Sequence, residues 1–156
     1  MYISCLIGFV IIFSYCIFVA IKDKEIPNSI SQTVYSLDNN HKWIFSAVMV
    51  IISFMILPQL LEVVPIGYEF LSYLTVLGII GVGIDPLDKD KKNIIHYVSA
   101  IIMGVSSQIL IYIMNPYLFL LWIPYIVYTM YKDDGRKNMF LSEMVMLSDT
   151  SWICLI

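Results

Sequence analysis

The stretch that decides the fold is residues 2–21, YISCLIGFVIIFSYCIFVAI, a run in which no side chain is charged. Twenty residues of α-helix rise about 30 Å, which matches the hydrocarbon thickness of a bilayer. The charged sequence Lys22-Asp23-Lys24-Glu25 follows at once. No Lys or Arg precedes Tyr2, and the run is longer than the apolar core of a cleavable signal peptide. We therefore expect residues 2–21 to form a retained membrane-spanning helix.

Comparable apolar stretches recur along the chain, and we expect further spans at about 43–61, 68–84, 94–114 and 117–131. The last stretch, 139–156, is long enough to cross but contains Glu143 and Asp149. A charge at the bilayer centre costs about 2.5–3.5 kcal/mol, so this stretch is either a sixth span or a surface-lying or bundle-packed helix. The sequence thus predicts an all-α fold, a polytopic transmembrane helical bundle of five or six spans, in a single domain of residues 1–156.

Composition supports the same class. Apolar residue types make up 60% of the 156 residues and charged types 13%, whereas an ordinary soluble domain is about 25% charged. The net charge of −3 comes without a clustered cationic face, which argues against nucleic-acid binding. The partners we expect are membrane lipids and either further copies of this chain or a membrane partner protein.

The positive charges indicate an orientation. All nine Lys and Arg residues fall in three predicted loops, 22–42, 85–93 and 132–138, and the other two loops have none. Loops enriched in Lys and Arg are cytoplasmic. We therefore expect an integral, multi-pass membrane protein with these three loops in the cytoplasm and the N-terminus outside. If residues 139–156 cross, the C-terminus lies outside as well.

Candidate catalytic residues gather at the cytoplasmic face in this topology. Ser29 and Ser31 lie in the first loop, Asp85 opens the third, and His96 begins the helix that follows. A histidine near carboxylates and serines has the groups needed for proton transfer. The alternative is that His96 is an interfacial anchor or a helix-packing donor.

No cofactor or metal is expected. The chain has two histidines, neither near a thiol, whereas a zinc hydrolase needs three or more ligands. The metalloprotease, nucleophile-elbow and phosphate-loop motifs are absent from the sequence. Gly78, Gly81 and Gly83 lie near the end of the third predicted span, where small residues let helices approach closely in lipid. The alternative for these glycines is a ligand cleft.

Two short stretches resemble a known family. Pro27-Asn28-Ser29-Ile30-Ser31-Gln32-Thr33 resembles the Pro-x-Ile-Ser-x-Thr signature of the DRAM-type six-helix membrane proteins, and the Asp-Pro loop leading to His96-Tyr97 is similar to that group and its bacterial relatives. With the hydropathy pattern, the resemblance covers about a fifth of the chain. It implies a six-helix bundle with a polar interfacial cluster at Ser29, Ser31 and His96. Gln32 departs from the acidic residue usual in the family, and the final span is weak.

Three functions follow as hypotheses. The leading one is a small integral membrane protein that is not an enzyme and acts through lipid or partner-protein contacts. The second is an intramembrane enzyme that acts on a lipid headgroup at the cytoplasmic face, with His96 as acid or base and Ser29 or Ser31 as its partner. The third is a holin-like oligomeric pore lined by Ser106, Ser107 and Gln108. A coupled transporter is disfavoured because the polar groups in mid-span are neutral.

Overall fold

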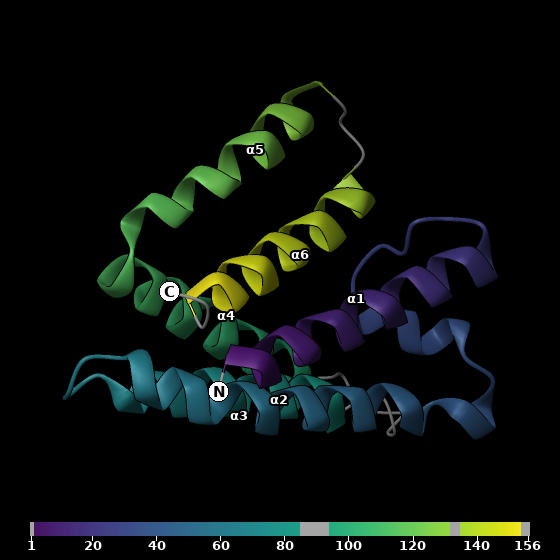
Figure 1. Ribbon diagram of the computed structural model, residues 1–156. Helices are drawn as coiled ribbons and strands as arrows, with labels where there is room; N and C mark the ends of the chain where they lie inside the picture. The colour runs from purple at the N-terminus through teal and green to yellow at the C-terminus, as the bar shows by residue number, and fades with distance from the viewer. Residues whose placement is uncertain (1, 85–93, 132–134, 154–156) are drawn as a thin grey trace.

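The computed structural model describes residues 2–84, 94–131 and 135–153, and this part of the chain is helical without any strand (Figure 1). The expected all-α class is confirmed for these residues. Asp85 and the rest of loop 85–93, residues 132–134 and residues 154–156 lie outside them. In chain order the elements are α1 (Tyr2–Asp23), η1 (Ser31–Ser36), η2 (Asn39–His41), α2 (Trp43–Val63), α3 (Glu69–Ile84), α4 (Ile94–Met114), η4 (Pro116–Leu121), α5 (Trp122–Tyr131) and α6 (Gly135–Ile153).

The first four α-helices lie within two residues of the ranges expected from the sequence, but the stretch 117–131 differs. It begins as the 3-10 helix η4 and becomes α-helical only in α5. The side chain of Asn115 accepts a hydrogen bond from the N–H of Tyr117 (3.1 Å), and Pro116 has no N–H to donate. Pro58, in contrast, lies inside α2 and does not terminate it.

Three of the helices are long and apolar enough to cross a membrane: Ile3–Asp23, Asn39–Val63 and Ile94–Met114. The segments Glu69–Ile84 and Pro116–Tyr131 are apolar but shorter. Within the described residues, α6 falls in neither group. The protein is therefore a helical bundle with three helices of membrane-spanning length and composition.

The helices pack mostly in chain order. α1 packs on α2, α2 on α3 and α3 on α4, while α6 lies against both α1 and α4 (Figure 1). α5 extends away from this bundle, and none of its residues is buried. The region between α4 and α6 is therefore covered less completely than the α2–α3–α4 side.

Glycines bring α3 into close contact with its neighbours. A Cβ placed on Gly78 would lie 2.8 Å from the backbone N of Met103, and one on Gly81 would overlap the side chain of Ser99. A Cβ on Gly83 would lie 2.6 Å from the Cβ of Met49 on α2. These distances are shorter than real Cβ contacts, so the packing interpretation of the three glycines is confirmed.

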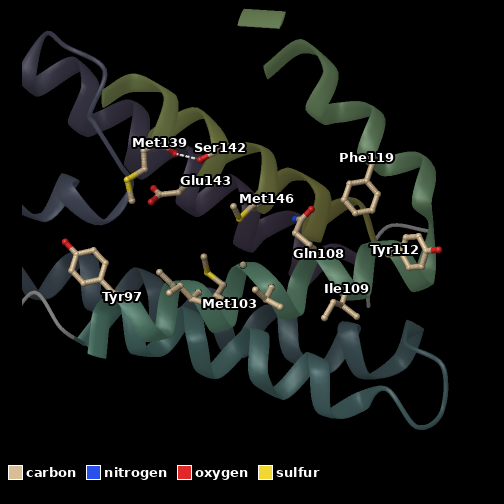
Figure 2. Close-up of a pocket in the computed structure, with 14 residues that line it drawn as sticks. Tyr97, Met103, Gln108, Ile109, Tyr112, Phe119, Met139, Ser142, Glu143 and Met146 are labelled. Carbon is tan, nitrogen blue, oxygen red and sulfur yellow. Dashed lines mark hydrogen bonds between the residues drawn. The ribbon is translucent and has the colours of Figure 1, made fainter. Parts of the chain in front are cut away.

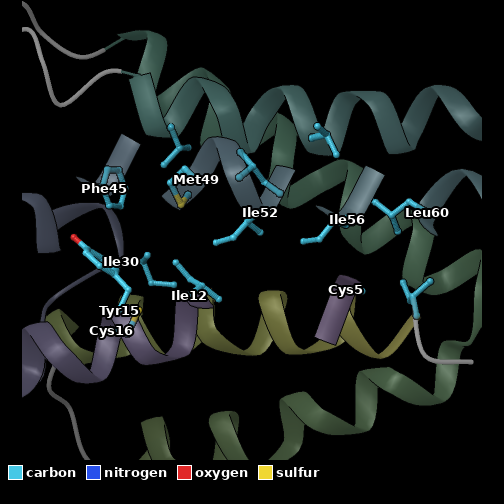
Figure 3. Close-up of a cluster of buried hydrophobic side chains, with 14 of the residues drawn as sticks. Cys5, Ile12, Tyr15, Cys16, Ile30, Phe45, Met49, Ile52, Ile56 and Leu60 are labelled. Carbon is cyan, nitrogen blue, oxygen red and sulfur yellow. The ribbon is translucent and has the colours of Figure 1, made fainter. Parts of the chain in front are cut away.

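The buried core includes a layer between α1 and α2 and continues onto α3 and α4 (Figure 3). One face of α2 contributes residues at helical spacing, which is why they point together toward α1. The fully or nearly fully buried members on these two helices include Cys5, Ile12, Tyr15, Cys16, Phe45, Met49, Ile52, Ile56 and Leu60. Other large apolar side chains on α1, α2, α3 and α4 remain exposed, among them Leu6, Val10, Phe54, Phe70, Leu77, Ile101 and Val105.

Candidate functional site

A small cavity brings together two of the candidate residues, from the first loop and α4, and a carboxyl group from α6. Ser31, His96 and Glu143 line the same space of about 30 Å³, together with apolar residues from α2, α3 and α4. Ser29 is connected to it because its hydroxyl lies 3.0 Å from the hydroxyl of Ser31. Ser29, Ser31 and His96 are thus brought together, and we call these three residues with Glu143 the interfacial cluster.

The loop after α1 is held in one conformation by its own polar groups. Ser29 is buried, and its hydroxyl accepts a hydrogen bond from the N–H of Gln32 (3.1 Å) in the first turn of η1. The hydroxyl of Thr33 is hydrogen-bonded to the carbonyl of Ile30 and to the hydroxyl of Tyr15 on α1 (2.9 Å). These bonds turn Ser31 toward α4 and bury Ile30 against α1 and α2.

Glu143 is the member of the cluster that was not among the candidates from the sequence. Its Oε2 accepts a hydrogen bond from the N–H of Ile30, a residue 113 positions earlier in the chain. Burial raises the pKa of Glu143 to about 7, and the hydrogen bond from Ile30 acts in the opposite direction. Near neutral pH this carboxyl group therefore exists in both protonation states. Of the other titratable groups, His96 faces it from α4 and Cys16 from α1.

The sequence did contain a signal for Glu143. An ionisable residue inside an apolar segment is by default a candidate for function. However, Glu143 lies only about one turn from the start of the stretch 139–156, a position that favours a carboxyl group in contact with water at the membrane interface. The contact with Ile30 depends on how α6 docks, and spacing along the chain carries no information on that.

A second, much larger cavity lies beside the cluster. It has a volume of about 790 Å³ between α4, α6 and η4, and we call it the α4–α6 groove (Figure 2). Ala100, Met103 and Glu143 line both cavities. The remaining described residues of its lining are mostly apolar or aromatic: Tyr97, Ile101, Gly104, Val105, Gln108, Ile109, Tyr112, Phe119, Met139, Ser142 and Met146.

The groove is open along its length and polar at one end. Tyr97, Ile101 and Tyr112 are each more than 60% exposed, so the groove faces the surroundings of the protein. Figure 2 shows the carboxyl group of Glu143 and the hydroxyl group of Tyr97 at the same end, with Tyr112 and Phe119 toward the other. The fifteen helical steps from Tyr97 to Tyr112 correspond to about 22 Å of helix, more than the roughly 15 Å of one lipid leaflet.

Gln108 lies within this groove and has unusual surroundings. Both polar atoms of its side-chain amide are buried, and neither has a hydrogen-bond partner in the protein. A buried amide without partners costs about 1–3 kcal/mol per unmade bond.

The other two residues expected to line a pore lie elsewhere. Ser106 and Ser107 are buried inside the chain. The hydroxyl of Ser106 is hydrogen-bonded to that of Thr75 on α3 (2.8 Å), and Ser107 donates to the carbonyl of Gly104 (3.1 Å). Ser106 thus connects α4 to α3, whereas the hydrogen bond of Ser107 stays within α4.

A metal centre has no support in the part of the chain that the structure describes, where no group of three or more His, Cys, Asp or Glu side chains has a suitable arrangement. Asp149 is fully buried on α6, where its Oδ2 accepts a hydrogen bond from the indole N–H of Trp122 (3.0 Å). This bond ties α5 to α6 at the end of the bundle away from the interfacial cluster. Comparisons of this chain with protein-family models, with curated proteins and with solved structures found no match.

Proposed function

We propose that this chain is a small polytopic integral membrane protein that holds a lipid molecule in the α4–α6 groove and is not an enzyme. The observation that carries the proposal is the groove itself, an apolar space of about 790 Å³ with one polar end. That volume falls in the range of about 300–1,000 Å³ typical of ligand sites.

Membrane insertion is supported by three helices of spanning length and by the exposed apolar side chains around them. Soluble monomers seldom expose contiguous apolar patches larger than a few hundred Å². In the orientation that we propose, the N-terminus is outside and loops 22–42, 85–93 and 132–138 are cytoplasmic. The interfacial cluster then lies at the cytoplasmic face, and α6 packs against the spans.

The orientation can be tested by labelling single cysteines with a membrane-impermeant maleimide. Lys24→Cys, Lys91→Cys and Lys137→Cys, each in a background without the three native cysteines, are expected to react from the same side of sealed vesicles. Permeabilised vesicles give the total reactive fraction as control. If any of the three positions labels from the other side of the membrane, a shared cytoplasmic face for loops 22–42, 85–93 and 132–138 is wrong.

The lipid itself can be tested by the native mass of the protein purified in a mild detergent. We expect a monomer that carries one lipid of a single class, recovered chemically unchanged. A clean oligomer without lipid would contradict the proposal and favour a pore or a structural assembly.

A second candidate is an intramembrane enzyme acting on a lipid headgroup. The observation that favours it is the shared cavity of Ser31, His96 and Glu143 beside the polar end of the groove. His96 would act as acid or base with Ser29 or Ser31 as its partner, and a carboxyl group that titrates near pH 7 could exchange the proton. A lipid recovered from the purified protein in cleaved form would favour this candidate.

A further inference from the structure

We propose that the α4–α6 groove selects amphiphiles that carry a protonated amine on a single long hydrocarbon chain, with Glu143 as the group that binds the amine. This inference rests on the proposed lipid-holding function and adds the chemical class of the ligand.

The first argument is the charge of the lining. Among the described residues that line the groove, Glu143 alone belongs to a type that carries a formal charge, and no Lys or Arg is among them. A carboxylate or phosphate headgroup placed at this end would meet a like charge in a partly buried setting, which disfavours binding. A protonated amine would meet an opposite charge.

The second argument is hydrogen-bonding capacity. An ammonium group has three donors and no acceptor, so it needs a site that supplies acceptors. A carboxylate has about four acceptor positions, and the N–H of Ile30 occupies one of those on Glu143. The hydroxyl group of Tyr97 lies at the same end of the groove (Figure 2).

The third argument is the shape of the rest of the site. Beyond Glu143 the groove continues between Met103 and Met146 toward Ile109 and Phe119, and its lining there is mostly apolar, with Gln108 and Tyr112 as the polar residue types (Figure 2). One hydrocarbon chain fits a single groove of this kind, with its polar atom at the Glu143 end.

The pKa of Glu143 is compatible with this role. At about 7 without a ligand, it is mostly ionised at pH 8, where an alkyl amine is protonated as lysine is. A bound ammonium group would favour the ionised carboxylate further. Among the described titratable groups, His96 on α4 and Cys16 on α1 face Glu143, and Tyr97 on α4 lies at the same end of the groove.

The test compares three probes of equal chain length: hexadecylamine, hexadecanol and hexadecanoic acid. Each is titrated at pH 8 into the delipidated full-length protein in a non-ionic detergent, and the bound fraction is read by native mass spectrometry. We expect the amine to bind at least tenfold more tightly than the alcohol, the size of effect typical of a charge-assisted hydrogen bond. The acid is expected to bind least.

The deciding variant is Glu143→Gln. Its amide oxygen still accepts from the N–H of Ile30, so the loop is expected to keep its conformation. It should reduce amine binding at least tenfold and abolish the preference for the amine over the alcohol. Equal binding of amine and alcohol by the unaltered protein, or preference for the acid, would overturn the inference while leaving the groove as a lipid site. If no probe binds and the purified protein carries no lipid, the proposed function itself fails.

Discussion

Replacing Gly78 by Ala is expected to destabilise the protein by about 3 kcal/mol, at the upper end of the usual range for overpacking. The added Cβ would lie 2.7 Å from the Cβ of Met103, 2.8 Å from its backbone N and 2.8 Å from the carbonyl of Ser99. Two of these three atoms belong to the backbone of α4, so no side-chain rotation relieves the contact. The two helices would have to separate along their shared interface.

The measurement is unfolding in mixed micelles followed by circular dichroism, with Gly8→Ala as the matched control. A Cβ on Gly8 would lie 3.6 Å from the nearest atom, the Cβ of Met55, which is ordinary van der Waals contact. Both substitutions gain the same intrinsic helix propensity, about 1 kcal/mol, so their difference isolates the packing at Gly78. Equal unfolding of the two variants would show that α3 and α4 do not approach as closely as described.

Replacing Gly104 by Phe is expected to reduce the lipid retained by the purified protein by roughly tenfold or more, equivalent to at least 1.4 kcal/mol. Gly104 lines the α4–α6 groove, and a Cβ there would meet only the Sδ of Met146, at 3.7 Å. The aromatic ring therefore has room to enter the groove without disturbing the helices, and it would occupy the space of the hydrocarbon chain.

Gly104→Ala is the control, because its methyl group fits in ordinary contact and leaves most of the groove open. Quantitative mass spectrometry of extracted lipid compares the two variants with the unaltered protein, and circular dichroism checks that both fold. If Gly104→Phe folds and retains as much lipid as Gly104→Ala, the α4–α6 groove is not where lipid is held.

The helices could be located from the sequence, but the way they pack could not. Uninterrupted apolar runs set helix length, so the bounds of α1 and α4 were predicted to within two residues. The stretch after Asn115 was harder, because hydropathy does not distinguish a 3-10 helix from an α-helix. Gly78, Gly81 and Gly83 indicated a close approach without identifying Ser99, Met103 and Met49 as the partners.

The candidate site was predicted in part. The sequence predicts Ser29, Ser31 and His96 as candidates because polar residues gather at one expected membrane face. In the structure Ser31 and His96 line one cavity, and the hydroxyl of Ser29 contacts that of Ser31. Glu143 and the groove depend on how α6 docks between α1 and α4, a tertiary arrangement that apolar periodicity does not encode. Asp85 lies outside the described residues, so its place in the cluster remains a prediction.

The hydrogen bond between Glu143 and Ile30 has a consequence for biosynthesis. The two residues are 113 positions apart, and chains are synthesised at about 5–20 residues per second. The loop after α1 must therefore wait roughly 6–23 s after its own translation before the carboxyl group that pairs with its backbone exists. During that interval the N–H of Ile30 needs water or another acceptor. The interfacial cluster is thus assembled only when translation is nearly finished, and a ribosome that stops before α6 releases a chain in which the first helices are made but the cluster is not.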